Sequence, residues 1–447
     1  MTSSMGKALL LLVLCLCGCI STPEIIEDIR TLPQDNTFYL DAGSANYEAA
    51  SPGALIEMHE RFMDHFFESW NRSVPSHSRD TLAVEFTRYP DPPAYGENGR
   101  KRTKKWFEDL AQNAHLETYP NAKLKAITIE NSSLRLLPTH KPHFSSRRAD
   151  GTGYPFDNLQ NSAIPANTPI SVVQVSRDKS WLFADSHYGS GWLPARDVAT
   201  VDTNLTDIWE HSDFVVIVRD GLPVHDENGT FLFMANLGAQ FPRMDQDDEN
   251  YVILVARGGE RGTAQIGGAV IPKDSAVLQP LRLTQTNIAV MANELINKPY
   301  GWGGLYQNRD CSSMLKDLFS PFGLWLPRHS SHQALKAGTF IDLSSLAPED
   351  REARILKHGI PFLTLIWVKG HIMLYVGSQD GRVVVFHNLW GVKTRDWLGR
   401  EDRNVVGHAA ITTLLPGAEL TNPDSHGHGL LNRIEGMTLL VVPNSPW

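Results

Sequence analysis

The sequence has no basic excess, no long hydrophobic run and very little cysteine. Its formal net charge of −9 is not that of a typical nucleic-acid-binding protein, which would carry a basic stripe, so we expect no nucleic-acid partner. The apolar run from Ala8 to Cys17 is far too short to span a bilayer. Three of the four cysteines precede Ile20, and only Cys311 lies farther along the chain. The N-terminal region and Cys311 therefore need separate explanations.

The N-terminus predicts export. Lys7 precedes the short apolar run, as in the core of a secretory signal. The residues Leu16-Cys17-Gly18-Cys19 match a lipoprotein processing box, in which the last cysteine is acylated. We expect a signal peptide over 1–18 and a lipid on Cys19, with an ordinary signal peptide as the alternative. Because Ile20 rather than aspartate follows, we expect an outer-membrane lipoprotein facing the periplasm, if the source is a Gram-negative bacterium.

Cys311 is then the only free thiol, because processing removes the first two cysteines and lipidation uses the third. In an exported protein such a thiol is either buried and inert or retained for its reactivity. The segment "YGWGG" predicts a loop before it, and the spacing of Met314, Leu315, Leu318 and Phe319 predicts a helix after it. A helix start lowers the pKa of a thiol through its dipole, and its N–H groups can stabilise an oxyanion.

Length and pattern predict a multidomain protein, since 447 residues exceed what one hydrophobic core usually serves. After the signal peptide we expect a lipid-anchored linker over 19–45 with little periodic structure, then a helical domain over 46–122. Short β-rich segments separated by turns predict two small β-barrels, over 123–203 and 204–282. Helices followed by strands over 283–447 predict an α+β domain.

Two histidines are expected to complete a site with Cys311. His371 opens the strand "HIMLYVG" and His387 closes the strand "RVVVFHN". If a loop over 377–381 joins these strands as a hairpin, Val376 pairs with Arg382 and His371 lies directly opposite His387. One imidazole can then act as the base for the thiol and the other can orient that base. A slip of one residue would place the two rings on opposite faces.

Other histidines are weaker candidates. His408 in "GHAAI" is an alternative third member of the site. His426 and His428 in "SHGHG" could indicate a metal site, but no further ligands follow at a suitable spacing. We therefore expect no metal and no cofactor.

Several motifs resemble those of the NlpC/p60-type papain-like cysteine peptidases of bacterial cell walls. They are "YGWGG…NRDCSSML", "LPRHSSHQ" and "GHIMLYVG" with a later histidine, and the resemblance is strongest from Thr284 to Trp447. The upstream pattern is similar to a subgroup with an N-terminal helical clip domain and two bacterial SH3-like barrels; "LRLLPTH" and "GSGWLP" fit the first barrel. The resemblance implies a papain-like catalytic fold and cleavage of the γ-D-glutamyl-meso-diaminopimelate bond in peptidoglycan stem peptides.

The resemblance also implies residue roles. Cys311 corresponds to the nucleophile, His371 to the general base and His387 to the residue that orients the base. Tyr300 matches an aromatic residue that assists the oxyanion, and Asp310 is either a groove residue or simply a helix N-cap. The implied substrate-binding set is Tyr300, Asp310, Ser312, Arg328, His329 and Ser330.

One departure from the family pattern bears on the substrate. Members that trim free stem peptides commonly read Pro-Arg-Asp where this chain has Pro327-Arg328-His329. That aspartate pairs with the free α-amine of the terminal L-alanine, and a buried ammonium without it would lose its partner. An L-alanine attached to muramic acid carries no such charge. We therefore expect a preference for peptides still attached to glycan, unless His329 is only a neutral surface replacement.

Three alternatives remain open from the sequence. The enzyme could recycle free L-Ala-γ-D-Glu-diaminopimelate peptides, or an inactive catalytic domain could leave a wall-binding lipoprotein. An acyltransferase is also possible, because an amine can intercept an acyl-enzyme. The expected partners are peptidoglycan stem peptides and a membrane reached through the lipid anchor, and we expect a monomer.

Overall fold

The computed structural model describes residues 24–41, 43, 46, 48–88, 94–147, 153–395, 400–420 and 429–441. The predicted signal peptide, Cys19, His426 and His428 lie outside the described residues. In the part of the chain that the structure describes, no helix is both long enough and apolar enough to cross a membrane.

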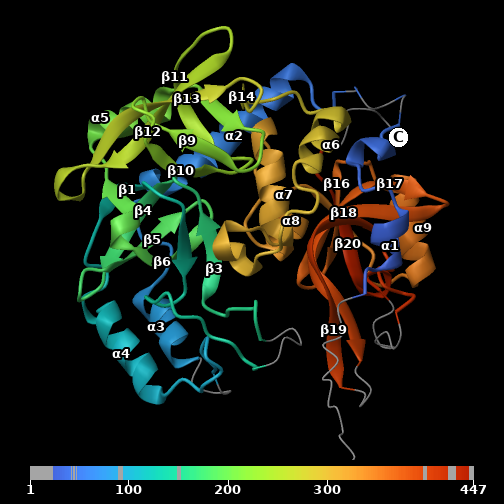
Figure 1. The fold of residues 1–447 in the computed structure, drawn as a ribbon, viewed down its shortest axis with the longest axis horizontal. Helices are drawn as coiled ribbons and strands as arrows, with labels where there is room; N and C mark the ends of the chain where they lie inside the picture. Colours follow the sequence, from blue (N-terminus) through green and yellow to red (C-terminus); the bar gives the residue numbers. More distant parts are fainter. Residues whose placement is uncertain are drawn as a thin grey trace, which may run out of the picture.

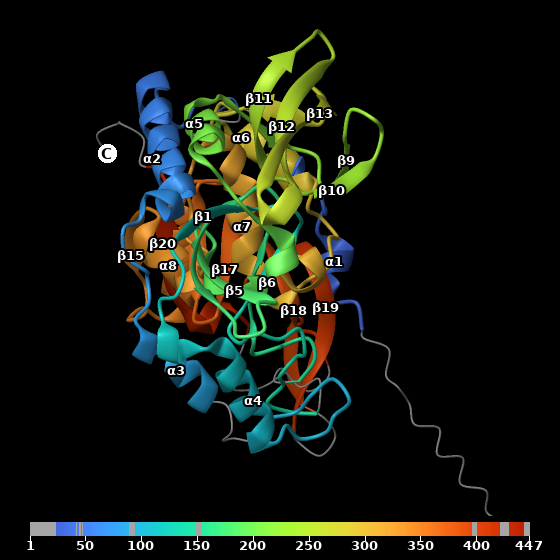
Figure 2. The ribbon, with the colours of Figure 1, turned by 90° about the vertical axis from the view of Figure 1, so that its left-hand side faces the viewer.

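The N-terminal helices pack on both sides of the first β-rich domain. α2 (Pro52–Asn71), α3 (Arg79–Thr87) and α4 (Lys104–Ala114) lie within the helical domain expected over 46–122. Each begins at a side-chain hydroxyl that accepts the N–H three residues later, from Ser51, Ser78 and Thr103. α3 buries only Leu82 and Phe86, which is too short an apolar pattern to stand out in the sequence. Figure 2 shows α2 at one end of the molecule and α3 with α4 at the other.

Two β-rich domains follow the helices, with α5 (Thr203–His211) between them. The first is a seven-stranded sheet in the order β3-β2-β6-β5-β4-β1-β7. Its strands are β1 (Leu124–Thr128), β2 (Ser132–Arg135), β3 (Gln160–Ile164), β4 (Pro169–Val175), β5 (Trp181–Ser186), β6 (Gly189–Pro194) and β7 (Val198–Thr200). All its neighbouring strands are antiparallel.

The second β-rich domain has a five-stranded sheet in the order β13-β12-β11-β8-β14 and a separate hairpin of β9 and β10. Its strands are β8 (Phe214–Ile217), β9 (Leu222–His225), β10 (Phe231–Ala235), β11 (Gln240–Gln246), β12 (Asn250–Gly258), β13 (Ala264–Pro272) and β14 (Ala276–Leu278). Its core contains buried residues from both sheets, among them Val224 and Phe233 from the hairpin and Phe241 and Ile253 from the five-stranded sheet.

The C-terminal domain places helices against a six-stranded sheet in the order β15-β20-β16-β17-β18-β19. Its helices are α6 (Gln285–Asn293), α7 (Cys311–Phe319), α8 (Ser330–Lys336) and α9 (Pro348–His358). Its strands are β15 (Thr339–Asp342), β16 (Thr364–Val368), β17 (His371–Gln379), β18 (Arg382–Arg395), β19 (Glu401–Thr413) and β20 (Ile434–Leu439). The predicted fold class is confirmed: a helical N-terminal segment, two β-rich domains and an α+β domain.

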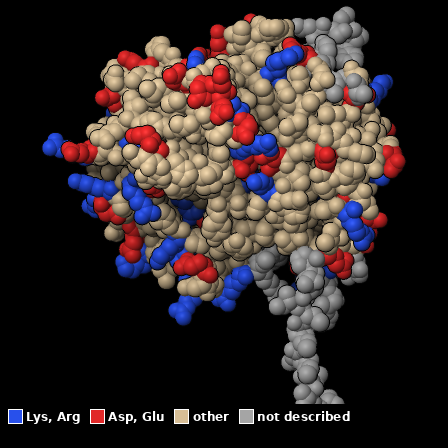
Figure 3. Space-filling view, turned by 45° about the horizontal axis from the view of Figure 1, so that its top comes forward, with Lys and Arg blue, Asp and Glu red and all other residues tan. Residues whose placement is uncertain are grey.

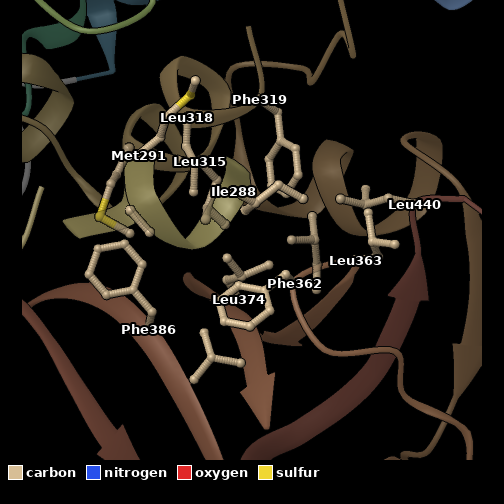
Figure 4. Close-up of a cluster of buried hydrophobic side chains, with 14 of the residues drawn as sticks. Ile288, Met291, Leu315, Leu318, Phe319, Phe362, Leu363, Leu374, Phe386 and Leu440 are labelled. Atoms are coloured by element: carbon tan, nitrogen blue, oxygen red, sulfur yellow. The ribbon is translucent and has the colours of Figure 1, made fainter. Parts of the chain in front are cut away.

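The core of the C-terminal domain fixes α7 against the sheet. Figure 4 shows Leu315 and Leu318 of α7 facing Leu374 of β17 and Phe386 of β18, and all four side chains are fully buried. Burial of each such side chain contributes about 1.5–3 kcal/mol. In Figure 1, α7 lies at the centre of the molecule, between the two β-rich domains and the six-stranded sheet.

Residues 24–41 differ from the expected linker. They contain α1 (Glu27–Thr31) and the 3-10 helix η1 (Asn36–Tyr39). Asp28 Oδ2 accepts the backbone N–H and the hydroxyl of Thr413, each at 2.8 Å. The Gln34 side chain donates to the carbonyl of Ile411 and accepts its N–H, at 2.9 and 2.8 Å. This segment is therefore fastened to β19 of the C-terminal domain.

The surface carries charges of both signs. Figure 3 shows acidic and basic side chains on the same face, with large uncharged areas between them. This mixture agrees with a formal net charge of only −9 over 447 residues.

Candidate active site

The cysteine stands at the first position of α7. Asp310 is the N-cap: its Oδ1 accepts the Ser313 N–H at 2.8 Å, and the Ser313 hydroxyl accepts the Asp310 N–H at 2.9 Å. This reciprocal capping box satisfies two N–H groups at the helix start. Cys311 is thereby held at the helix start, and it is 7% exposed.

The hairpin that carries the two histidines has a different register from the expected one. Gln379 pairs with Arg382, so the turn consists of Asp380 and Gly381, whose φ angles are 51° and 75°. Positive φ at both central positions is typical of a tight two-residue turn. The expected loop over 377–381, with Val376 paired to Arg382, is therefore wrong.

A β-bulge between Tyr375 and Gly377 then shifts the pairing register by one residue, which changes the face on which the earlier residues of β17 lie. Without it, the tight turn would place His371 and His387 on opposite faces of the sheet, since opposed residues share a face. The bulge adds one residue to β17, and beyond it Leu374 pairs with Phe386. The two histidines consequently share a face, but they are diagonal neighbours and not directly opposite each other.

The two imidazoles form a hydrogen-bonded pair. Nε2 of His371 lies 2.8 Å from Nδ1 of His387, and Nε2 of His387 lies 3.0 Å from Oγ1 of Thr412. The Thr412 hydroxyl itself donates to the carbonyl of Thr413 at 2.8 Å. Its single proton is thus used, so it accepts the N–H of His387. The assignment continues along the chain of bonds: Nδ1 of His387 accepts from Nε2 of His371, which leaves Nδ1 of His371 as an unprotonated base.

Burial keeps both rings neutral. It lowers the pKa of His371 to about 4, with a smaller contribution from the positive charge of Arg433. Burial also holds the pKa of His387 well below its usual value, helped by repulsion from His371. Neutral rings are the form that the chain of hydrogen bonds to Thr412 requires.

The thiol is also neutral in the substrate-free protein. Burial, followed by the negative charge of Asp310, raises the pKa of Cys311 to about 12. The N–H groups of Ile372 and Ser312 act in the opposite direction but do not outweigh burial. The helix start therefore acts on this pKa in the expected direction, through the Ser312 N–H, but burial outweighs it in the unliganded site. The N–H of Ile372 also places the sulfur beside the residue that directly follows His371.

Arg328 is hydrogen-bonded to residues at the start of α7. Its guanidinium makes two hydrogen bonds to the Asp310 carboxylate, at 2.7 and 3.1 Å, and one to the Ser312 hydroxyl at 3.0 Å. Its Nε donates to Ser162 of the first β-rich domain at 2.8 Å. Arg328, Asp310 and Ser312 are all buried, so the structure places these three predicted substrate residues in one network beneath the cysteine.

His329 and Ser330 lie apart from this network. His329 is the N-cap position of α8 without a capping side-chain bond, and it is exposed. Ser330 is the first residue of α8 and is half-buried. His408 is bonded to its own neighbourhood, with Nδ1 at 3.1 Å from the carbonyl of Ala409, and takes no part in the histidine pair.

A cavity of about 530 Å³ opens beside His371. Tyr300 also lines it, and burial followed by the charges of Cys311 and Asp310 raises the pKa of this phenol well above its usual value. Three further aromatic residues contribute to its lining: Trp302, Trp390 of β18, and Phe156 from the first β-rich domain. The ring centroids of Phe156 lie 5.1 Å from Trp302 and 6.2 Å from Trp390. Of the predicted residues, Tyr300 and His371 line this cavity.

The glycines before the cysteine allow the first β-rich domain to approach closely. Gly303 and Gly304 have φ angles of 59° and 82°, which favour glycine. A Cβ on Gly303 would lie 2.6 Å from the carbonyl oxygen of Gln160, and one on Gly304 would lie 2.4 Å from the Cβ of Ala163. The Gln160 amide also donates to the Gly303 carbonyl at 3.0 Å. The first β-rich domain is therefore part of the wall of the site.

Thr412, Phe156 and Ser162 were not identified from the sequence. Thr412 lies two positions after Ala410, the residue paired with His387, so strand parity could have indicated it. Phe156 and Ser162 carry no local signal, because they reach the site from another domain. In the described residues, no three or more His, Cys, Asp or Glu side chains are grouped so as to hold a metal ion.

Comparison with protein families finds four matches along the chain. The NLPC_P60 stabilising domain (N-terminal) matches residues 8–119, and an SH3 domain of the SH3b1 type matches 142–194. An SH3 domain of the SH3b2 type matches 202–248, and the NlpC/P60 family matches 297–395. The last match contains Cys311, His371 and His387.

Two solved structures of NlpC/P60 proteins are similar to this chain. An NlpC/P60 endopeptidase from Photobacterium damselae subsp. piscicida superposes with a TM-score of 0.82 at 26% identity, over 95% of this chain and 100% of that one. An NlpC/P60 family protein from Bacillus cereus has a TM-score of 0.47 at 14% identity, over 71% of this chain and 100% of that one. Among curated proteins, no significant match is found.

Proposed function

The chain is an NlpC/P60-type cell-wall hydrolase with an N-terminal stabilising domain and two SH3b domains, and from this premise we propose its reaction. It is a cysteine endopeptidase that cleaves the γ-D-glutamyl-meso-diaminopimelate bond of peptidoglycan stem peptides. NlpC/P60 proteins are cysteine peptidases, and the bond is the one that the family motifs imply. The carrying observation is the chain of hydrogen bonds from Thr412 through His387, which leaves Nδ1 of His371 unprotonated.

The proposed reaction has two halves. The Cys311 thiol gives its proton to Nδ1 of His371 while the sulfur attacks the γ-carbonyl carbon of D-glutamate. The carbon–nitrogen bond then breaks, and the imidazolium returns this proton to the departing amine of diaminopimelate. In the second half a water gives a proton to His371, its oxygen attacks the thioester, and the thiolate leaves and recovers the proton. His387 supports each step, because it accepts from Nε2 of His371 whether that ring is neutral or charged.

The substrate is proposed to be stem peptide still attached to glycan. Position 329 carries an exposed imidazole where a carboxylate would be needed to pair with the free amine of L-alanine. A muramoyl-linked L-alanine has an amide there and requires no such partner. Activity on the free tripeptide equal to that on intact sacculi would contradict this preference.

The location is proposed from the N-terminal sequence. Cleavage before Cys19 and acylation of its thiol would produce a lipoprotein of the outer membrane facing the periplasm. The enzyme would then share a compartment with the wall. Radiolabelled palmitate incorporation into the wild type, but not into Cys19→Ala, is the expected result.

The decisive experiment is digestion of purified diaminopimelate-type peptidoglycan, with the products identified by mass spectrometry. The wild type should release fragments that end in D-glutamate, and Cys311→Ala should release none. Ser345→Ala changes an exposed serine in the same domain to alanine. It is the control for the preparation of a variant protein and should cleave as the wild type does. Cleavage of free tripeptide alone would move the function to peptide recycling, and no cleavage of either substrate would leave a wall-binding protein.

A further inference from the structure

The charged groups that line the cavity beside His371 are all positive. Lys393, Arg403 and Arg433 contribute to its lining, and no acidic residue does so among the described residues. This is unusual for a chain whose formal net charge is −9. A cavity lined by one sign of charge favours a ligand of the other sign.

The three cations are not equivalent. Lys393 Nζ is paired with the Glu401 carboxylate at 3.1 Å, and Arg403 lies over the ring of Phe156 with its guanidinium carbon 6.0 Å from the ring centroid. Arg433 donates from Nη2 to the carbonyl of Lys369 at 3.2 Å, and within the described residues it has no carboxylate partner. Arg433 is exposed, so its guanidinium is accessible to a ligand.

Arg433 lies on the side of the site where the leaving group departs. It lines the same cavity as His371, and after burial its charge is the next contribution that lowers the pKa of that imidazole. In the proposed reaction His371 delivers a proton to the departing amine, so the residue that owns this amine lies beside His371. Asp310 and Arg328, by contrast, are buried beneath Cys311 and bonded to each other.

We propose that Arg433 binds the carboxylate on the D-centre of meso-diaminopimelate and thereby selects this residue over L-lysine; this rests on the proposed function. The two diamino acids have the same leaving amine. They differ by one carboxylate at the far end of the side chain, which diaminopimelate carries beside its second ammonium. A guanidinium attracts that carboxylate in a charge-assisted pair and repels the lone ammonium of lysine.

The test uses two muramoyl peptides that differ only in the diamino acid: muramoyl-L-Ala-γ-D-Glu-meso-diaminopimelate and muramoyl-L-Ala-γ-D-Glu-L-Lys. The wild type should prefer the first by about ten-fold or more in kcat/KM, the range expected for one hydrogen-bonded charge contact. Arg433→Gln should reduce this preference to within about three-fold, mainly through a higher KM for the diaminopimelate peptide. Arg433→Lys should keep an intermediate preference, because the charge remains without the planar fork.

Arg354→Gln is the matched control. It removes one exposed arginine from α9 of the same domain, outside the cavity, and should leave the preference unchanged. An unchanged preference in Arg433→Gln, or no preference in the wild type, would overturn the inference while leaving the proposed reaction intact. Failure of the wild type to cleave either peptide at the γ-D-glutamyl bond would overturn both.

Discussion

Oγ1 of Thr412 lies 3.0 Å from Nε2 of His387, in a fully buried environment. Threonine has one proton to donate, and it is given to the Thr413 carbonyl. The contact therefore sets the direction of every hydrogen bond as far as His371. A fully buried residue thus decides which imidazole nitrogen is basic.

Thr412→Val should lower kcat while leaving KM nearly unchanged. Valine has a similar shape but cannot accept the N–H of His387, so His387 is free to place its proton on either nitrogen. We expect a fall in kcat of roughly 10- to 100-fold, a part of the total contribution of general-base catalysis. Thr412→Ser should restore most of the rate, and ¹⁵N NMR of the imidazoles should show the change of tautomer. A full rate in Thr412→Val with the wild-type tautomer would show that the contact is only structural.

The acid limb of activity should lie far below that of an ordinary histidine. Burial lowers the pKa of His371 to about 4, so the base stays unprotonated well below the usual pKa of 6.5. We expect kcat/KM for a muramoyl stem peptide to fall only as the pH approaches about 4. The measurement is the pH profile of the wild type between pH 3.5 and 8, over the range in which the fold persists.

The same shift predicts the pH dependence of stability. A histidine whose pKa is lowered by folding binds its proton more readily in the unfolded chain, so it destabilises the fold at low pH. The stability is complete above the unfolded pKa of about 6.5 and is lost as the pH falls toward about 4. His371→Asn should reduce this loss, measured as the difference in Tm between pH 7 and pH 5. An equal loss in both proteins would contradict the lowered pKa.

Alkylation of Cys311 should be slow in the substrate-free protein. A thiol with a pKa of about 12 has far less thiolate at pH 7.5 than an unfolded thiol near 9.0, and burial also restricts access. We therefore expect iodoacetamide to label the folded protein more slowly than the urea-unfolded chain. Slow labelling is thus compatible with an active peptidase, and an alkylation assay does not separate the enzyme from an inactive binder. Faster labelling of the folded chain would indicate a thiolate at rest.

Gly304→Ala should disturb the joint between the first SH3b domain and the site. The new Cβ would lie 2.4 Å from the Cβ of Ala163, in addition to the strain of a φ of 82°. Gly221→Ala is the control, since its φ is 78° but a Cβ would meet nothing within 4 Å. The control should lose about 1–2 kcal/mol from backbone strain alone.

Calorimetry should show a larger fall in Tm for Gly304→Ala than for Gly221→Ala, together with a loss of activity. Equal falls in Tm for the two variants, with full activity in both, would mean that the domain boundary accommodates the added Cβ at position 304 without further cost.

The sequence identifies the reactive side chains more reliably than it identifies their surroundings. Cys311 follows from a helix start and His371 from a strand start, which are local patterns. His387 was expected to close its strand, but it lies inside β18, which continues to Arg395. The hairpin register was wrong because neither the tight Asp380-Gly381 turn nor the bulge was anticipated. The two errors nearly cancel: the tight turn alone would separate the histidines, and the bulge brings them back to one face.

What the sequence could not supply depends on contacts between distant segments. The pKa of Cys311 was expected to fall, because a helix dipole is visible in a sequence whereas complete burial of a thiol is not. The role of Arg328 depends on Ser162, which comes from another domain. Neither α3 nor the docking of residues 24–41 could be predicted from the sequence, because neither segment has a long apolar stripe.

If Cys19 carries the proposed lipid, the attachment of residues 24–41 to β19 would limit the distance between the membrane and the catalytic domain. Asp28 and Gln34 hold this segment on the catalytic domain itself. From Cys19 to Glu24 a fully extended chain covers at most about 18 Å. A lipid on Cys19 would therefore keep the catalytic domain against the bilayer surface. The domain could then cleave only the layer of peptidoglycan nearest the membrane.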